Sequence, residues 1–508
     1  MTEATEVDGG IEVGLDKFQL FEKWLRDSGS KFPKLELQDY GNEVRGCHAT
    51  EMVQSGDTLV DIPLKCLITV EMGKETDIGK AILASNIDLD APKHIFLMLF
   101  ILVDRKKSDS FFKPYYDILP ATLRNMPIFW NDDELNYLKG SFMVQQIVDR
   151  KEAIENDYRS IIAILPEFKN LCDMETFKWA RMAVCSRNFG IVVNGLRTAA
   201  LVPYADMLNH LRPRQSKWQF DDQTQSFTIL AIQQLALGAQ VYDSYGQKCN
   251  HRFLLNYGFS VESNVESDGF CPNEVPFLIG INQEDPLFEE KTSILRRDGG
   301  TGISRRVRVA VGDSDATKVL LALLRLVELT PEEYNSISLL PGGFKSLRDA
   351  MIPFSVVNEA NALKLLMKKC MLMLDAYPSS YDEDVQRLSG QTPWAGSIKP
   401  DIVEGETEPI DPVSVLYTNE RHAVIQTRGE KEVLGHYLVM AEIGCDLLNS
   451  GCNDKDLETI VKNKLRGKVH ESIYQYCRGP LVRLVRDHTR QLELNGKVVE
   501  ANGIPPSS

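Results

Sequence analysis

The sequence predicts an α+β fold in which a strand-rich region is interrupted by a helical insert and followed by a helical region. Three observations lead to this prediction. Residues 35–69 and 201–260 contain short strand patterns, residues 92–186 between them have helical spacing, and helical patterns dominate beyond about residue 273. At 508 residues the chain is too long for a single hydrophobic core, so we expect more than one domain.

The first strand-rich region and the insert are distinguished by their apolar periodicity. An amphipathic pattern predicts a short helix over residues 17–27. The segments Thr58-Leu-Val-Asp-Ile-Pro and Cys66-Leu-Ile-Thr-Val then alternate or run apolar, as short strands do. In the insert, apolar residues recur at the spacing of one helix face, as in Ile95, Met98, Leu99 and Leu102.

Strand signals return after the insert and then give way to helices. Phe227-Thr-Ile-Leu-Ala, Gln240-Val-Tyr-Asp-Ser-Tyr and residues 253–259 are expected to be strands. Residues 381–412, rich in Asp, Glu, Pro and Gly, predict an exposed loop or insertion. The C-terminal helices are expected over residues 316–329, 360–377, 412–449 and 454–493.

Composition and charge exclude several classes of protein. The chain has 57 Lys plus Arg against 72 Asp plus Glu, and a net charge of −15 argues against a surface built for nucleic acid. The most apolar run, residues 95–103, is about half as long as a membrane span, and the acidic first ten residues lack the apolar core of a secretory leader. We expect a monomeric protein of the cytoplasm, and also of the nucleus, without nucleic acid or membrane partners.

Cysteines and glycines give no cofactor motif. The ten cysteines contain no Cys-x-x-Cys pair, which indicates reduced thiols rather than a zinc ribbon or a disulfide framework. The loop Gly299-Gly-Thr-Gly302 lies between arginine pairs, but no strand precedes it and no Lys-Ser or Lys-Thr follows it. We therefore expect a basic surface loop there, not a phosphate-binding loop.

Chemistry-bearing residues gather in three clusters of the second strand-rich region. They are Cys185-Ser-Arg-Asn-Phe-Gly190, Leu201-Val-Pro-Tyr-Ala-Asp-Met-Leu-Asn-His210, and Gly238-Ala-Gln-Val-Tyr-Asp-Ser-Tyr-Gly246 followed by Asn256-Tyr-Gly-Phe259. Taken alone, their carboxylate, amide and imidazole groups could be metal ligands, but the spacing recurs by chance and we expect no metal. The candidate ligands are Asp206, Asn209, His210 and His251.

In this order, the clusters resemble the SET-domain protein methyltransferases. Asp206-Met-Leu-Asn-His210 is similar to the family's Asn-His motif, and Gly238 through Tyr245-Gly246 to its Gly-Glu…Tyr motif, with Ala-Gln in place of the usual acidic pair. Upstream, Arg45-Gly46-Cys-His-Ala-Thr50 resembles the Gly-x-Gly opening, although Val44 replaces the first glycine. The chain resembles most the Rubisco large-subunit methyltransferase-like branch.

Further segments extend the resemblance over nearly the whole chain. They are Ile68-Thr-Val-Glu-Met-Gly73, Phe111-Phe-Lys-Pro-Tyr-Tyr-Asp-Ile-Leu-Pro120, Ser186-Arg-Asn-Phe189 and Arg428-Gly-Glu-Lys-Glu-Val-Leu434. The resemblance implies a SET domain over residues 20–262, split by a helical insert over about 91–178. It also implies an all-helical substrate-binding domain over residues 275–495.

The resemblance implies S-adenosylmethionine as cofactor and assigns residues around it. Arg187 is expected to pair with the cofactor carboxylate, because a guanidinium fork suits that group. His48 stands where some relatives have Arg. The full implied cofactor set is Arg45, Gly46, His48, Glu71, Met72, Gly73, Arg187, Asn209, His210, Tyr245, Gly258 and Phe259.

The implied reaction is methylation of a lysine side chain in a non-histone protein. Tyr245 is expected to be the catalytic hydroxyl that orients the amine, while Phe189 and Tyr257 wall the substrate channel. Asp206 is expected either to attract the cationic lysine or to cap a turn.

Two alternatives to lysine methylation stay open at this stage. Relatives that methylate histidine in actin carry Asn where this chain has Phe189, and an amide can hold an imidazole whereas a phenyl ring cannot. Phe189 therefore favours lysine, with histidine as the alternative. A binding protein that keeps the SET fold without turnover is the other alternative.

Overall fold

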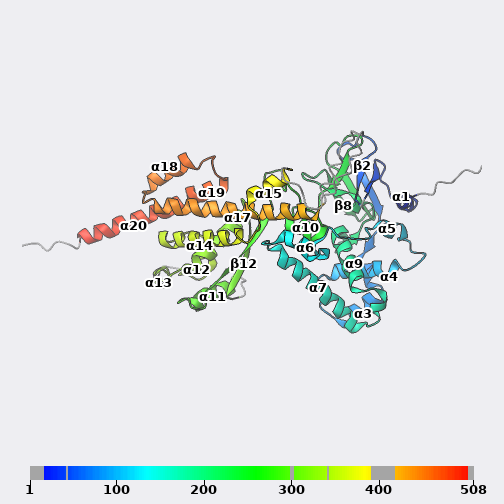
Figure 1. The fold of residues 1–508 in the computed structure, drawn as a ribbon, viewed down its shortest axis with the longest axis horizontal. Coiled ribbons are helices and arrows are strands. Elements are labelled where there is room, and N and C mark those ends of the chain that lie inside the picture. The colour runs from blue at the N-terminus through cyan, green and yellow to red at the C-terminus, as the bar shows by residue number, and fades with distance from the viewer. Residues whose placement is uncertain (1–15, 42–43, 298–301, 340–342, 391–417, 502–508) are drawn as a thin grey trace, which may run out of the picture. The chain divides into compact units, whose positions relative to one another are not determined.

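The computed structural model describes residues 16–41, 44–297, 302–339, 343–390 and 418–501 (Figure 1). The chain divides into two compact units. The first comprises residues 1–129, 147–247 and 255–258, and the second comprises residues 130–146, 248–254 and 259–508. The domain boundaries expected from the sequence stay a prediction.

The first unit mixes short strands with helices. Its strands are β1 (Leu35–Gly41), β2 (Val44–Ala49), β3 (Thr58–Pro63), β4 (Ile68–Thr69), β5 (Asn188–Val193), β6 (Leu196–Leu201), β7 (Asn209–His210), β8 (Ser216–Asp221), β9 (Ser226–Ala231) and β10 (Gln240–Asp243). Helices whose residues lie wholly or mostly in it are α1 (Lys17–Asp27), α2 (Val70–Lys74), α3 (Asp77–Ser85), α4 (Pro92–Asp104), α5 (Lys113–Ile118), α7 (Met143–Ile164), α8 (Phe168–Leu171) and α9 (Met174–Arg187).

The strands of the first unit form three small sheets, with orders β1-β2-β10-β7, β3-β9-β8 and β4-β6-β5. Neighbouring strands come from segments on both sides of the helical insert, so β2 pairs with β10 and β4 pairs with β6. The fold therefore needs long-range pairing to assemble, and this pairing brings the sequence clusters together.

Local chemistry explains where the helices of the first unit begin and how they pack. The side chain of Asp16 accepts hydrogen bonds from the backbone of Phe18 and Gln19 and caps α1. Helix α4 is apolar on nearly every side, as expected for a helix buried within a domain. A Cβ atom on Gly73 of α2 would lie 1.8 Å from the carbonyl oxygen of Phe96 in α4, so only glycine permits this close approach.

The second unit is mainly helical. Its strands are β11 (Glu274–Gly280) and β12 (Ser304–Ala310). Its helices include α6 (Asp132–Leu135), α11 (Phe288–Arg297), α12 (Ser314–Val327), α13 (Pro331–Ser338), α14 (Val356–Leu374), α15 (Tyr381–Leu388), α17 (Asn419–Asn449), α18 (Asp454–Lys464), α19 (Glu471–Tyr476) and α20 (Val482–Ala501), and α10 (Asn250–Tyr257) begins in it.

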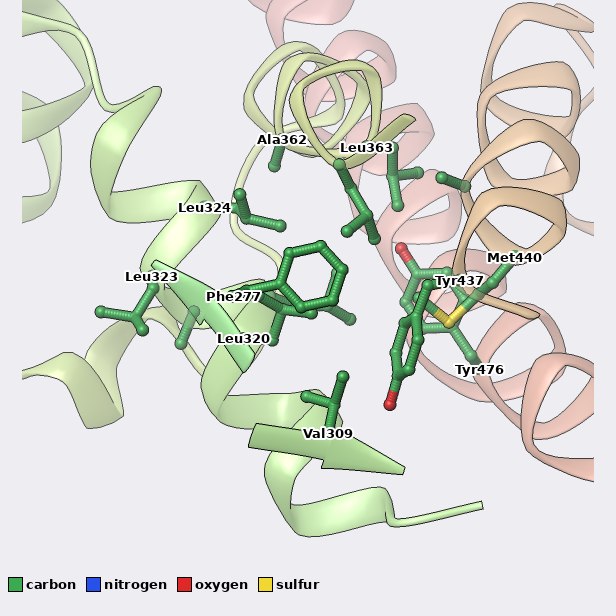
Figure 2. Close-up of a cluster of buried hydrophobic side chains, with 14 of the residues drawn as sticks. Phe277, Val309, Leu320, Leu323, Leu324, Ala362, Leu363, Tyr437, Met440 and Tyr476 are labelled. Atoms are coloured by element: carbon green, nitrogen blue, oxygen red, sulfur yellow. The ribbon is translucent and has the colours of Figure 1, made fainter. Parts of the chain in front are cut away.

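One hydrophobic core joins the strands and the long helices of this unit. Phe277 of β11 and Val309 of β12 point into a cluster with Leu320, Leu363 and Tyr437 from α12, α14 and α17 (Figure 2). All five side chains are buried. Since each element contributes one apolar face, the elements are stable only when packed together.

The predicted α+β class is confirmed, and three local predictions differ from the structure. Residues 253–259, expected as a strand, mostly belong to helix α10, which ends before Gly258 at a positive φ of 79°. The domain expected to be all-helical also contains the strands β11 and β12, and Pro276 interrupts the strand pattern of β11. Within the expected loop 381–412, the first residues form α15, while residues 391–417 lie outside the described chain.

Two further sequence expectations concern segments that the structure describes only in part. Most of the Gly299-Gly-Thr-Gly302 loop lies outside the described residues. Among the helices that are described, none combines the length and apolar character needed to cross a membrane.

Candidate functional site

Three strands bring the sequence clusters of the first unit together. In the central sheet, β10 pairs antiparallel with β2, with Gln240 opposite His48. On its other edge β10 pairs parallel with β7, with Tyr242 opposite Asn209 and Asp243 opposite His210. The Arg-Gly, Asn-His and Tyr-Gly motifs, which are far apart in sequence, are therefore adjacent in the fold.

Asn209 links these strands through its side chain. Its amide donates hydrogen bonds to the backbone oxygen of Arg45 at 2.8 Å and to Oε1 of Gln240 at 3.0 Å. Gly46 of β2 is packed closely against Tyr40, because a Cβ at Gly46 would lie 2.4 Å from the hydroxyl of Tyr40. Asn209 thus holds β2 in register beside the site, and Gln240 is a partner that the sequence did not indicate.

A buried ion pair lies beside these strands. Arg187, the last residue of α9, donates from Nη1 to Oδ2 of Asp206 at 3.1 Å, and the hydroxyl of Tyr115 donates to the same oxygen at 2.8 Å. Burial lowers the pKa of Arg187, but Asp206 and Tyr115 outweigh it, so the pKa of Arg187 lies above its ordinary value. Arg187 is therefore permanently charged.

Arg45 adds a second cation to this pair. Its Nη1 donates to the backbone oxygen of Ile118 at 2.5 Å. Burial, and then the charge of Arg187, lower the pKa of Arg45 to about 10, while Asp206 opposes the shift. Asp206 pairs with Arg187 and influences Arg45 only through its charge, so the cluster of Arg45, Arg187 and Asp206 has two cations for one carboxylate.

Three polar atoms of this cluster are buried without a hydrogen-bond partner: Nη2 of Arg45, Nε of Arg187 and Oδ1 of Asp206. Leaving a buried donor or acceptor unpaired costs about 1–3 kcal/mol each, so such atoms need an explanation. Two donors and one acceptor fit a ligand that carries both an anionic and a cationic group.

Tyr245 follows β10 and lies close to this cluster. Its hydroxyl donates to the backbone oxygen of Leu208 at 2.9 Å, and its ring stacks on Tyr257 with 4.9 Å between centroids. Burial raises the pKa of Tyr245 although the charge of Arg187 opposes it, so the phenol keeps its proton at neutral pH. Tyr245 can accept a hydrogen bond at its oxygen but cannot serve as an anionic base.

His210 also contacts Tyr245. Its Nδ1 accepts a hydrogen bond from the backbone N–H of Tyr245 at 3.1 Å, and the two ring centroids are 5.2 Å apart. This bond ties the Asn-His motif to the Tyr-Gly motif. The structure thus brings together Arg45, Gly46, Arg187, Asp206, Asn209, His210, Tyr245 and Tyr257 of the predicted residues.

Other predicted residues have structural partners. Nδ1 of His48 donates to the backbone oxygen of Gly238 at 2.9 Å, and its Nε2 lies 2.5 Å from the hydroxyl of Tyr40. Glu71 accepts from the hydroxyl of Thr198 at 3.0 Å. Met72 caps the start of α2 through its sulfur. These contacts leave their predicted cofactor roles as predictions.

The remaining predicted residues, Phe189, Gly258 and Phe259, each have their own structural contacts. Phe189 packs edge-on against Trp218 and Phe227, with centroid distances of 5.6 and 5.0 Å. Gly258 has its backbone oxygen 3.4 Å from the side-chain amide of Asn125. Phe259 belongs to the second unit and stacks on Phe253 there.

The site also includes a residue that sequence reasoning missed. Tyr115 occurs in the Phe111–Pro120 segment used for the resemblance, but no role was assigned to it. It is fully buried, and burial followed by the charge of Asp206 raises its pKa well above the ordinary value. Its phenol is therefore a permanent donor that fixes one oxygen of Asp206.

One group of possible metal ligands occurs in the second unit, away from the predicted set except for His251. Donor atoms of Cys249, His251 and Glu274 lie within 4.8 Å of one another. Arg308, however, donates to Glu274 at 2.8 Å and lies 3.1 Å from Nε2 of His251. Burial raises the pKa of Cys249 to about 12, so its thiol stays protonated. This group is a hydrogen-bonded cluster around an arginine.

Comparison with solved structures identifies the fold. The SET domain of LSMT bound to methyl-lysine and AdoHcy superposes with a TM-score of 0.68 at 22% identity, covering 86% of this chain and 94% of that one. This chain has the LSMT SET fold. Rubisco LSMT bound to AdoMet gives a TM-score of 0.66 at 22% identity, covering 86% and 94% of the two chains.

Sequence comparison agrees with this fold. Residues 282–434 match the family described as Rubisco LSMT substrate-binding. The actin-histidine N-methyltransferase of Homo sapiens is 24% identical over 463 residues, covering 88% of this chain and 76% of the relative. That of Plecturocebus moloch is 25% identical over the same length and coverage. The predicted resemblance to SET-domain methyltransferases of the Rubisco branch is confirmed.

Proposed function

We propose that this chain is an S-adenosylmethionine-dependent protein methyltransferase. The observation that carries the proposal is the buried cluster of Arg45, Arg187 and Asp206, with three unpaired polar atoms, beside the phenol of Tyr245. Solved neighbours of the same fold are bound to AdoMet or AdoHcy. Fold and site chemistry therefore support the same cofactor.

The amino-acid end of S-adenosylmethionine matches the unpaired atoms by chemistry. Its carboxylate suits the free donors of Arg45 and Arg187, and its ammonium suits Oδ1 of Asp206. A bound carboxylate would also compensate the excess positive charge of the cluster. We infer that Tyr115 and Asp206 position Arg187 for this contact.

When bound, S-adenosylmethionine supplies a methyl group on a positively charged sulfonium. The acceptor amine must present a neutral lone pair, yet a lysine with its reference pKa of about 10.4 is almost fully protonated at neutral pH. A buried site beside Arg187 disfavours the ammonium form of the amine. The protonated phenol of Tyr245 can then accept from an amine N–H and orient the lone pair, so no anionic base is required.

We propose lysine as the acceptor. Phe189 has no group that could hold an imidazole by a hydrogen bond, and it packs against two further aromatic rings. Histidine is the second candidate, because the named relatives are actin-histidine N-methyltransferases. The solved neighbours include LSMT bound to lysine and to methyl-lysine.

The acceptor is identified by transfer of labelled methyl groups. The full chain is incubated with methyl-tritiated S-adenosylmethionine and a cell extract, and the labelled proteins are hydrolysed and separated as amino acids. We expect the label in methylated lysine, and about tenfold less or lower still with the Tyr245→Phe variant at the same exposure. Label in methylhistidine would replace lysine by histidine. Absence of label from a chain that binds the cofactor would favour the non-catalytic alternative.

A further inference from the structure

The strands β11 and β12 of the second unit form a two-stranded sheet with two different faces. Val275, Phe277 and Ile279 are buried on the inner face, where Phe277 reaches the core cluster (Figure 2). Because side chains alternate along a strand, Leu278 lies on the opposite face, and 57% of it is exposed. The outer face therefore lies outside the hydrophobic core that the inner face contacts.

Cations gather around Leu278 on this outer face. Arg306 of β12 is the residue directly opposite Leu278 in the antiparallel register. Lys369 of α14 donates from Nζ to the backbone oxygen of Leu278 at 3.3 Å, and Lys368 precedes it. We call Leu278, Arg306, Lys368 and Lys369, together with Leu372, the basic sheet face.

These cations lack anionic partners within the described part of the chain. Neither Arg306, Lys368 nor Lys369 forms a salt bridge with a residue there, whereas neighbouring Arg308 is paired with Glu274 at 2.8 Å. Burial, and then the charge of Lys368, lower the pKa of Lys369. A bound anion would reduce the repulsion between the ammonium groups of Lys368 and Lys369. The chain has a net charge of −15, so this local group of unpaired cations is opposite in sign to the chain as a whole.

The basic sheet face also exposes apolar surface. Leu372, which lies one helical turn after Lys369, is 62% exposed, and Leu278 is 57% exposed. Neither edge of the sheet formed by β11 and β12 pairs with another described strand. Since the backbone oxygen of Leu278 already accepts from Lys369, an extended polypeptide would bind here through its side chains, by apolar contacts and ion pairs.

We propose that the basic sheet face binds an extended, acidic segment of a partner protein that carries apolar residues between its carboxylates. Carboxylates would pair with Arg306, Lys368 and Lys369, and the apolar residues would cover Leu278 and Leu372. The two exposed leucines favour a polypeptide over a nucleic acid, because a phosphate backbone offers them no apolar partner.

Peptide binding to the full chain tests this proposal without any methyl transfer. The probe is a short fluorescein-labelled peptide of repeated Glu-Glu-Val-Val, which presents both residue types on each face of an extended strand, titrated by anisotropy at low salt. We expect saturable binding that Arg306→Glu or Lys368→Glu weakens by about tenfold or more, and that rising salt also weakens. Because the cofactor is absent, failure here would leave the proposed methyltransferase function unaffected.

Matched controls separate this face from general electrostatics. Lys455 on α18 is an exposed cation, and Lys455→Glu makes the same change of charge elsewhere in the second unit. We expect its peptide affinity to stay within about twofold of the wild type. Circular dichroism would verify that each variant is folded.

Three results would overturn the proposal. The first is absence of binding by the wild type, and the second is equal weakening by Lys455→Glu and Arg306→Glu. The third is tighter binding of a single-stranded oligothymidine than of the peptide, lost in Arg306→Glu. A peptide of repeated Glu-Glu-Ser-Ser that bound as tightly as the Glu-Glu-Val-Val peptide would contradict the role of the leucines.

Discussion

Arg45 and Arg187 are two buried cations near the carboxylate of Asp206, which forms an ion pair with Arg187 and acts on Arg45 through its charge alone. Moving an ion out of water costs several kcal/mol even after relaxation, so one cation in excess destabilises the folded unit. A ligand that supplies an anion at this point gains affinity from the existing imbalance. Binding of such an anion therefore removes a charge imbalance that destabilises the folded unit.

The Tyr245→Phe variant tests the role of a single hydroxyl. Removing it deletes the acceptor for the substrate amine while leaving the ring stacked on Tyr257. We expect turnover to fall by about tenfold or more, equivalent to about 1.4 kcal/mol of barrier, with cofactor affinity nearly unchanged. Steady-state kinetics and calorimetry measure the two quantities. Turnover equal to that of the wild type would exclude the hydroxyl from the reaction.

At the residue scale, the sequence was informative where a residue belongs to a motif. Arg187, Asp206 and Tyr245 were predicted from sequence motifs, and the structure places them close together. Tyr115 was missed because its contact with Asp206 spans 91 positions, and no local pattern reports such a contact. The same reason applies to Gln240, whose partner Asn209 lies 31 positions away.

At the element scale, helices with their own start signals were predicted well. The helix expected over residues 17–27 has the same bounds in the structure, because Asp16 and Gln19 form a capping box at its start. Helix α10 was mistaken for a strand because its apolar residues Phe253, Leu254 and Leu255 are contiguous. A short apolar run does not distinguish a buried strand from a buried helix segment.

The approach of α2 to α4 gives a prediction about these two elements. In Gly73→Ala, the new methyl group would lie 1.8 Å from the carbonyl oxygen of Phe96, so the helices must separate. We expect the free energy of unfolding to fall by about 1–3 kcal/mol or more, measured by chemical denaturation. Gly190→Ala is the matched control, because a Cβ at Gly190 has no atom within 4 Å. Equal stability of the two variants would contradict this packing.

At the scale of the whole molecule, a buried carboxyl couples stability to pH. Glu430 of α17 accepts hydrogen bonds from Ser141 and Gln426, each at 2.6 Å, and from Tyr377, with Lys431 adjacent. Burial raises the pKa of Glu430 from 4.5 to about 7, although these neighbours oppose the shift. The folded chain therefore keeps a proton that the unfolded chain releases above pH 4.5.

This difference fixes the sign of the pH dependence. The contribution of Glu430 is fully present below about pH 4.5 and is lost as pH rises to about 7, by up to about 3 kcal/mol. Glu430→Gln should remove this dependence, whereas Glu432→Gln, at an exposed neighbour, should retain it. Denaturation midpoints between pH 4.5 and 8 measure it. A wild-type profile that matches Glu430→Gln would disprove the assignment.

The central claim is that Arg45, Arg187 and Asp206 form the binding site for the amino-acid end of S-adenosylmethionine. Isothermal titration calorimetry of the full chain with S-adenosylhomocysteine tests it most directly, with Arg187→Ala and, as control, Arg197→Ala at an exposed position of β6. We expect the wild type and Arg197→Ala to bind alike, and Arg187→Ala to bind at least about tenfold more weakly. Equal affinity of all three proteins, or no binding by the wild type, would contradict the account.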